Sequence, residues 1–190
     1  MESDLIDVLI KDHDELRELF DRLTDPHLLP ERSQEVASVA IAELVRHSVA
    51  EEAYLYPTAR QALDGGEDLV RREIADHTRA EELMKDIEGV PVHDARFFKL
   101  ISELATDVRA HIEEEETVLF PRMRVACDPN ELLRLGARAE AIKRVGPTHP
   151  HPSAPDTPPW NIILAPGAGL VDRLRDLFSD RPTKLDDLPD

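Results

Sequence analysis

One pattern of histidine and glutamate residues occurs twice in this chain, and the two copies lie 64 positions apart. Each copy begins with an Asp-His pair and continues, 34 residues after that histidine, with a His-x-x-x-Glu motif. The six residues are His13, His47 and Glu51 in the first copy and His77, His111 and Glu115 in the second. Four imidazoles and two carboxylates related by internal symmetry suit a pair of metal ions, so the repeat indicates chemistry as well as fold.

The helical spacing of these residues places polar groups on faces that are otherwise apolar. Residues four apart lie on one face of a helix, so each His-x-x-x-Glu motif directs both side chains to the same point. The stripe that carries Ile101 and Leu104 runs without a break into His111 and Glu115, which must therefore point inward. Burying an unpaired carboxylate costs on the order of several kcal/mol. No Lys or Arg shares the stripe near Glu51 or its repeat mate, and two cations would neutralise both carboxylates.

The donor types narrow the choice of metal. A single histidine on an apolar helix face is usually a hydrogen-bonded core residue, but four histidines and two glutamates in matching register favour metal binding. Imidazole and carboxylate without thiolate suit iron, manganese or zinc. A structural zinc site is usually tetrahedral and contains Cys, and the single cysteine, Cys127, lies outside the pattern. Six nitrogen and oxygen ligands shared by two ions favour two iron ions, with manganese as the alternative.

Four amphipathic segments precede residue 126, each with apolar residues spaced alternately three and four apart. The first is predicted to begin after Ser3 as its N-cap, and the second to begin near Ser33, with Pro57 kinking or restarting it. The fourth continues to Pro121. The connections are short, which makes neighbouring helices antiparallel. The sequence therefore predicts an all-α, up-down-up-down four-helix bundle over residues 1–126.

The remainder of the chain changes in composition. Residues 127–146 contain a further, shorter helix, and seven of the fifteen prolines then fall between residues 147 and 166. Residues 147–190 are therefore predicted to be an extended Pro-rich tail, which ends in a short amphipathic helix over 170–178. Two roles fit this tail: a strap held across the bundle by Trp160 and Ile162–Leu164, or an arm for dimerisation or partner binding.

The 190 residues carry a formal net charge of −17. This acidity opposes contact with phosphate backbones and acidic membranes, so we expect neither nucleic acid nor a membrane as a partner. We see no secretory signal and no apolar run long enough to span a membrane, and a lone cysteine permits no disulfide within the chain. These features predict a cytoplasmic protein that is a monomer or a weak dimer. The other histidines receive no role: His27, His93, His149 and His151.

The order His, His-x-x-x-Glu, His, His-x-x-x-Glu resembles that of the hemerythrin-like, or HHE cation-binding, domain over residues 1–126. The resemblance implies a four-helix bundle around a non-heme di-iron centre with an oxo or hydroxo bridge and two bridging carboxylates. It makes Glu51 and Glu115 the bridges and the four histidines terminal ligands: His13, His47, His77 and His111. The tail after Gly146 is similar to the long Pro-rich tails of some actinobacterial members.

Two positions depart from the family pattern. Oxygen-carrying hemerythrins have a fifth histidine one turn before the third-helix ligand, and here that position is Glu73. Tyr54 follows the first His-x-x-x-Glu motif by three residues, whereas its repeat mate is Val118. Tyr54 is predicted either to coordinate a metal ion in the place of the missing histidine or to hydrogen-bond a carboxylate or water. Glu73 and Glu81, one turn on either side of His77, are further candidate ligands.

The donor set and the resemblance together predict a redox enzyme. Anionic oxygen ligands stabilise the ferric state and so hinder reversible oxygen carriage, and the resemblance includes bacterial members that act on small oxidants. We therefore expect a di-iron oxidoreductase, peroxidase-like or catalase-like, that consumes hydrogen peroxide or nitric oxide. No catalytic residues are expected beyond the metal ligands. The alternative is an oxygen- or iron-binding carrier, store or sensor.

Overall fold

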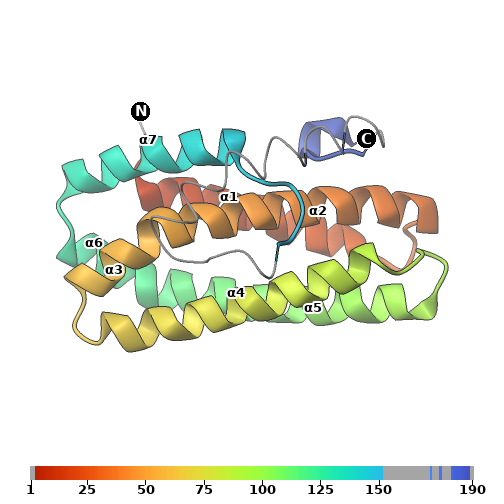
Figure 1. The fold of residues 1–190 in the computed structure, drawn as a ribbon, viewed down its shortest axis with the longest axis horizontal. Helices are drawn as coiled ribbons and strands as arrows, with labels where there is room; N and C mark the ends of the chain where they lie inside the picture. The colour runs from red at the N-terminus through yellow and green to blue at the C-terminus, as the bar shows by residue number, and fades with distance from the viewer. Residues whose placement is uncertain (1–2, 152–171, 173–175, 177–180, 189–190) are drawn as a thin grey trace.

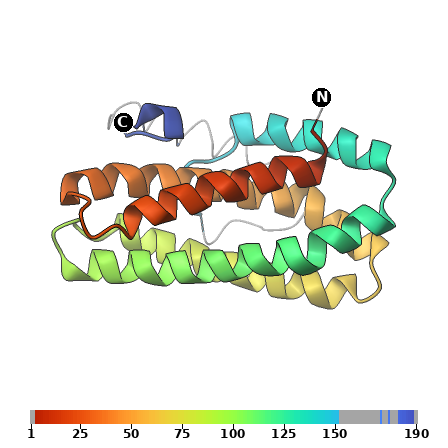
Figure 2. The same cartoon turned by 180° about the vertical axis from the view of Figure 1, so that it is seen from behind.

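The computed structural model describes residues 3–151, 172, 176 and 181–188, and every regular element in these residues is helical. This confirms the all-α prediction. The four long helices are α1 (Leu5–Leu23), α2 (Pro30–Ala50), α4 (Gly66–Glu88) and α5 (Ala95–Glu114). They run side by side along one axis, with α1 and α2 forming one layer and α4 and α5 the other (Figure 1, and from behind in Figure 2).

The starts of the first two helices differ slightly from the prediction. Asp4, not Ser3, caps α1: its side chain accepts a hydrogen bond from the backbone N–H of Asp7 at 2.9 Å, and the Asp7 side chain accepts one in return. This reciprocal pair satisfies two N–H groups that would otherwise lack partners. α2 begins at Pro30 and not near Ser33, because proline at the first helical position has no N–H to satisfy.

Each half of the repeat contains a π-helical turn immediately after its long second helix. α2 continues through η1 (Glu51–Leu55) into α3 (Tyr56–Ala62), and α5 continues through η2 (Glu115–Leu119) into α6 (Phe120–Ala126). Pro57 has no N–H, so it cannot make the regular bond to the carbonyl four residues earlier. The chain widens just before it, and the N–H of Tyr56 bonds the carbonyl of Glu51, five residues back.

Two buried apolar clusters fill the bundle, one toward each end. On α1, Leu16 and Phe20 belong to the first cluster and Leu5 and Leu9 to the second, with His13 between them. α2 and α4 likewise contribute to both clusters, and in the rest of the bundle α5 contributes to the first cluster while η2 and α6 contribute to the second. The residues of the repeated pattern therefore form a polar layer between two apolar cores, and close packing on both sides holds that layer in place.

The helix expected within residues 127–146 is α7 (Pro129–Val145), which lies against α1 and α2 on the side away from α4 and α5 (Figure 1). Asp128 caps it by accepting hydrogen bonds from two backbone N–H groups of its first turn. α7 thus adds a fifth helix to one half of the bundle.

The described parts of the tail pack on the bundle. Thr148 and His149 are buried, and their backbone N–H groups donate to the Asp172 carboxylate at 3.0 and 3.1 Å. A 3₁₀ turn, η3 (Leu185–Asp187), lies close to α2, where Arg46 donates to the Thr183 carbonyl. Trp160 and most of the helix expected over 170–178 lie outside the described residues. None of the helices in the described part of the chain has both the length and the apolar character needed to cross a bilayer.

Candidate metal centre

The four long helices and the π-helical turns that continue two of them bring all six residues of the repeated pattern to the middle of the bundle. Three groups of residues each place one donor atom per residue within 4.8 Å of the others. The groups are His13, His47, Glu51 and Glu115; then Glu51, His77 and His111; then Glu73, His111 and Glu115. Because Glu51 and Glu115 each belong to two groups, the three groups form one continuous site.

Both repeat glutamates reach histidines of both halves. Oε1 of Glu51 lies 3.1 Å from Nε2 of His47, and its other oxygen, Oε2, lies 3.2 Å from Nε2 of His77. Oε2 of Glu115 lies 3.4 Å and 3.8 Å from the Nε2 atoms of the α1 and α5 histidines. Each carboxylate therefore stands between a histidine of one half and a histidine of the other, where a ligand shared by two ions would stand.

The donor atoms of this site fit metal ions. Glu51 and Glu115 have 0% of their surface exposed. Among the described residues, the buried site atoms without a hydrogen-bond partner are Nε2 of His13 and His47, both ring nitrogens of His111, both oxygens of Glu51 and Glu73, and Oε2 of Glu115. Leaving so many buried polar atoms unpaired is unfavourable. Cations at the centre would satisfy them together.

Carboxylates behind two of the histidines orient their rings. Nδ1 of His13 lies 2.9 Å from Oε1 of Glu116, and Nδ1 of His77 lies 2.9 Å from Oε1 of Glu52. Each of these glutamates belongs to the half opposite its histidine, so the halves brace each other. A carboxylate acceptor keeps the proton on Nδ1 and leaves Nε2 free to bind a metal.

A third histidine has a buried aspartate behind it. Nδ1 of His47 lies 3.4 Å from Oδ2 of Asp12, and the other oxygen of Asp12 pairs with Nζ of Lys143 on α7. Burial alone would raise the pKa of Asp12, but the hydrogen bond with His47 and the charge of Lys143 bring it below its usual value. Sequence reasoning placed Asp12 in the repeated pattern without giving it a role, and it missed Lys143, because the two residues lie 131 positions apart and no local pattern connects them.

In the metal-free protein, nearby carboxylates favour the protonated forms of His47 and His77. Burial alone would lower the pKa of His47, but Glu51 and Asp12 raise it to about 10. Burial likewise opposes the charged form of His77, yet Glu51 and Glu52 raise its pKa well above the usual value. A metal ion that binds here must displace these protons.

Tyr56, and not Tyr54, is the tyrosine that contacts the site. The prediction for Tyr54 assumed α-helical spacing beyond Glu51, and the π-helical turn adds one residue to that turn. Tyr56 consequently follows Glu51 on the inward face and has 0% of its surface exposed. Tyr54 is partly buried and packs against the second apolar cluster. The available sequence signal was Pro57, which lies one position after Tyr56.

The mismatch that the sequence placed at Tyr54 and Val118 therefore lies at positions 56 and 120. The Tyr56 hydroxyl lies 2.9 Å from Nε2 of His77 and 3.3 Å from Oε1 of Glu115. Its repeat mate, Phe120, stacks on the ring of His13 with centroids 5.4 Å apart. One half of the site thus has a phenol beside its ligand nitrogen, and the other half has a phenyl ring.

Of the two further candidate ligands, the structure brings only Glu73 into the site. Glu73 is 1% exposed, and its Oε2 lies 3.1 Å from Nδ1 of His111. It occupies the position of the missing fifth histidine. Glu81 is partly exposed and lies near His151, whose pKa is raised mainly by Asp172 and to a smaller extent by Glu81.

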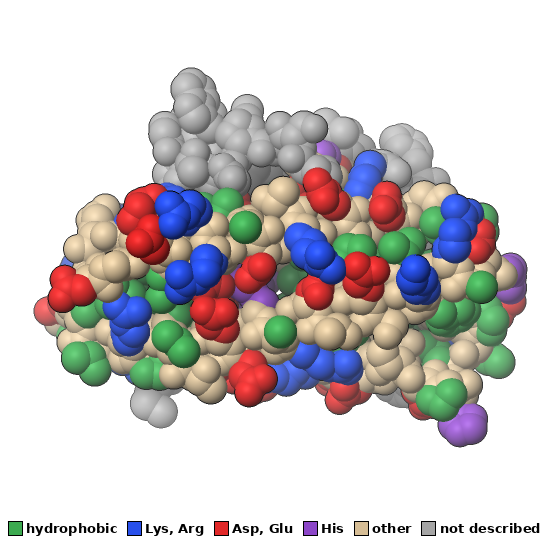
Figure 3. Space-filling view, turned by 90° about the horizontal axis from the view of Figure 1, so that it is seen from below, with side chains coloured by type: hydrophobic (Ala, Val, Ile, Leu, Met, Phe, Trp, Pro, Cys, Tyr) green, Lys and Arg blue, Asp and Glu red, His purple; other side chains and the backbone are tan. Residues whose placement is uncertain are grey.

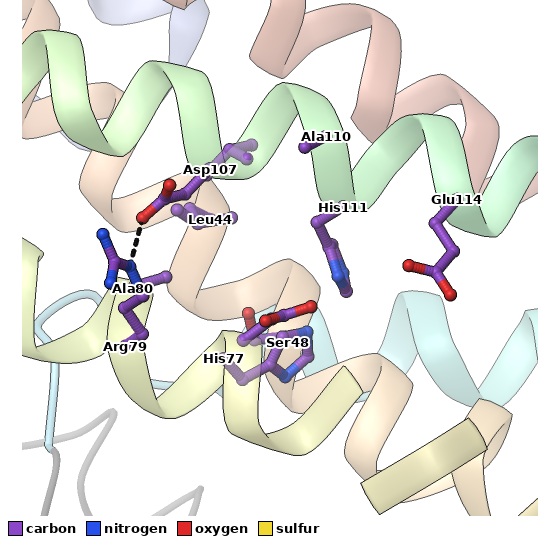
Figure 4. A pocket seen from close by; sticks show the side chains of 11 residues that line it. Leu44, Ser48, His77, Arg79, Ala80, Asp107, Ala110, His111 and Glu114 are labelled. Atoms are coloured by element: carbon purple, nitrogen blue, oxygen red, sulfur yellow. Dashed lines mark hydrogen bonds and ion pairs between the residues drawn. The ribbon is translucent and has the colours of Figure 1, made fainter. Parts of the chain in front are cut away.

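A cavity of about 330 Å³ reaches the second half of the site between α4, α5 and α2. His77 and His111 line it from facing helices, and the ion pair of Arg79 and Asp107 stands farther along (Figure 4). Arg79 is more than half exposed, so this pair marks the outer part of the cavity. The space-filling view of this face shows a hollow with a histidine side chain visible within it (Figure 3). Small molecules can therefore approach the second half of the site.

Comparison with known proteins identifies one matching family and two related proteins. The model of the Hemerythrin HHE cation binding domain matches residues 4–123. An uncharacterised hemerythrin-like protein of Schizosaccharomyces pombe is 30% identical over 141 residues, which cover 74% of this chain and 70% of that protein. A DNA nickase of Nostoc sp. is 29% identical over 119 residues, which cover 62% of this chain and 33% of the nickase.

A solved structure shares the fold. The crystal structure of a hemerythrin HHE cation-binding-domain-containing protein from Mycobacterium kansasii aligns with a TM-score of 0.64 and 20% sequence identity. The alignment covers 75% of this chain and 86% of that one. At 20% identity this similarity establishes the arrangement of the helices alone. The chemistry of the site follows from its own residues.

Proposed function

Because this chain belongs to the hemerythrin HHE cation-binding family, we propose that it is a non-heme di-iron oxidoreductase that consumes hydrogen peroxide or nitric oxide. The observation that carries the proposal is the cavity, which reaches one half of a buried, two-ion ligand set. A redox centre needs such an approach for a small oxidant, and this cavity is large enough to admit one.

The residues divide into two metal positions that share Glu51 and Glu115. His13 and His47 serve the first position, and His77 and His111 serve the second. Glu73 and Tyr56 complete the second position, where the cavity arrives. Two iron ions bound there would supply a pair of redox-active cations beside an exchangeable position. Manganese accepts the same nitrogen and oxygen donors and is the alternative metal.

The anionic oxygens around the second position favour oxidation chemistry over reversible oxygen carriage. Glu73 brings a carboxylate to the place where oxygen carriers have a neutral histidine. Added negative charge stabilises the higher oxidation state of a cation, which opposes a cycle that must return to the ferrous state. Leu44, Ala80 and Val108 line the cavity with apolar surface, which admits small uncharged molecules such as peroxide and nitric oxide.

The test is consumption of the oxidant by iron-loaded protein. Hydrogen peroxide should be mixed with the protein, with and without a nitric oxide donor, and the loss of each reactant followed. Metal-free protein and an equal amount of free iron are the controls. We expect turnover well above both. Turnover no faster than that of free iron would reject the enzymatic proposal.

An oxygen- or iron-binding carrier, store or sensor is the second candidate. The burial of His13 and His47, at 0% and 1% exposure, favours it because deeply buried ligands hold a metal for long periods. Reversible spectral change between oxygen and vacuum, without peroxide turnover, would support the binding function.

The similarity to the Nostoc nickase does not lead us to propose action on DNA. The chain covers only a third of that protein. A net charge of −17 opposes contact with a phosphate backbone.

A further inference from the structure

The helix α7 follows the region matched by the family model. Its Lys143 side chain places a positive charge behind one of the candidate metal ligands. α7 packs along α1 and α2 on the outside of the bundle (Figures 1 and 2). Gly136 permits a very close approach: a Cβ at this position would stand 2.5 Å from the carbonyl oxygen of Ser3 and 2.9 Å from the backbone nitrogen of Leu5. This close approach fixes the position of α7 relative to the start of α1.

A continuous chain of contacts runs from α7 to the first metal position. Nζ of Lys143 pairs with Oδ1 of Asp12, and Oδ2 of Asp12 lies 3.4 Å from Nδ1 of His47. Nε2 of His47 in turn lies 3.1 Å from Oε1 of Glu51. The side chains of Lys143 and Asp12 are only 17% and 7% exposed, so solvent screens their charges little. The ion pair with Lys143 offsets the cost of burying the Asp12 carboxylate.

The second half of the repeat lacks this arrangement. Asp76 is the repeat mate of Asp12, but it is exposed and lines the cavity. Nδ1 of the corresponding histidine, His111, faces Glu73 at 3.1 Å, a residue that is itself a candidate ligand. The two halves therefore have nearly identical ligands but different groups behind those ligands. The difference comes from α7, which supports the ligand His47 through Asp12.

We infer that Lys143 is a positioning residue that fixes His47 through Asp12 and makes the first metal position the tighter of the two. The inference rests on the proposed two-metal site. Asp12 stands where it accepts a hydrogen bond from Nδ1–H of His47, which orients the ring and strengthens Nε2 as a donor. Lys143 offsets the charge of Asp12 and prevents it from being drawn away toward solvent. The first position then holds its ion firmly, while the second, beside the cavity, keeps an exchangeable place.

The experiment measures Co²⁺ binding to metal-free protein, by absorption and by competition with a chelator, so it needs no activity. Wild-type protein should bind two Co²⁺ ions with distinguishable affinities. Lys143→Met should weaken the tighter step by up to about the ten- to hundredfold that follows removal of the direct partner of a metal ligand, here Asp12. The weaker step should keep its affinity. Arg138→Met, which removes an exposed cation from the same helix, is the matched control.

A double-mutant cycle separates positioning from a general loss of structure. Asp12→Asn should weaken the same binding step, and Lys143→Met should add little in that background because both act through one contact. Lys143→Arg, which keeps the positive charge, should retain most of the tighter affinity. Thermal unfolding of each metal-free variant checks that the bundle remains folded.

The possible results divide clearly. Unchanged affinities in Lys143→Met, equal weakening of both steps, or additive effects in the cycle would each overturn the inference while leaving the metal site intact. Failure of wild-type protein to bind Co²⁺ at all would instead overturn the two-metal site, and the role of Lys143 with it.

Discussion

Replacing Tyr56 with phenylalanine tests whether the π-helical turn places Tyr56, and not Tyr54, at the metal site. The change removes one fully buried hydroxyl, whose neighbours are Nε2 of His77 at 2.9 Å and Oε1 of Glu115 at 3.3 Å. The ring should still fit, because Phe120 occupies the equivalent position in the other half. The matched control is Tyr54→Phe, which removes a hydroxyl two residues away.

The magnitude follows from burial. Without the Tyr56 hydroxyl, Oε1 of Glu115 loses its hydrogen-bond donor in a site with 0% exposure. Leaving a buried acceptor unpaired costs about 1–3 kcal/mol, and about 1 kcal/mol corresponds to roughly 2–4 °C in a chain of this size. Metal-free Tyr56→Phe should therefore unfold about 2–12 °C below wild type. Tyr54 is partly exposed, so its replacement should change stability by about 0.5 kcal/mol or less.

The iron-loaded protein provides an independent readout. A phenolate bound to ferric iron gives a visible absorption band, and Tyr56→Phe should abolish any such band while Tyr54→Phe preserves it. The reverse result, with the band lost in Tyr54→Phe and retained in Tyr56→Phe, would refute the reasoning from the π-helical turn. Equal thermal midpoints in wild type and Tyr56→Phe would show that the hydroxyl contributes nothing to the metal-free site.

Three further predictions address charge, pH and packing. Glu115→Ala should lose most bound iron, measured by metal analysis, because Glu115 belongs to two of the three donor groups. In metal-free protein, Glu51 and Asp12 overcome burial and raise the pKa of His47 from 6.5 to about 10. This stabilisation is fully present below pH 6.5 and is lost as the pH rises toward 10, so the denaturant midpoint should fall across that window. Gly136→Ala should lower the free energy of unfolding, measured by thermal denaturation, by about 1–3 kcal/mol, because its Cβ would meet the backbone of residues 3–5 at the start of α1.

Each of these has a clear contrary result. Full iron retention in Glu115→Ala would exclude its role as a shared ligand. A flat or rising midpoint between pH 6.5 and 10 would show that His47 is not protonated in the metal-free protein. A more stable Gly136→Ala, as helix propensity alone would give, would mean that α7 can shift away from α1.

The helices and the converging ligands were predictable because both follow from local spacing. The His-x-x-x-Glu motif places its two side chains one turn apart in any α-helix, and apolar stripes state which face is buried. The prediction failed where the helix was not α-helical. Tyr54 was assigned to the inward face by α-helical spacing, whereas the wider turn gives that place to Tyr56.

The sequence by itself determined the family, the all-α bundle and the set of histidines and glutamates that meet at its centre. These depend on periodicity within single helices, which the chain carries in its residue order. Only the tertiary structure decided how the two halves differ. The pairing of Asp12 with Lys143, the cavity beside His77 and the entry of Glu73 into the ligand set arise where separate helices pack together. Contacts between residues far apart in the chain leave no periodic trace, so the inequality of the two metal positions appears only in the folded protein.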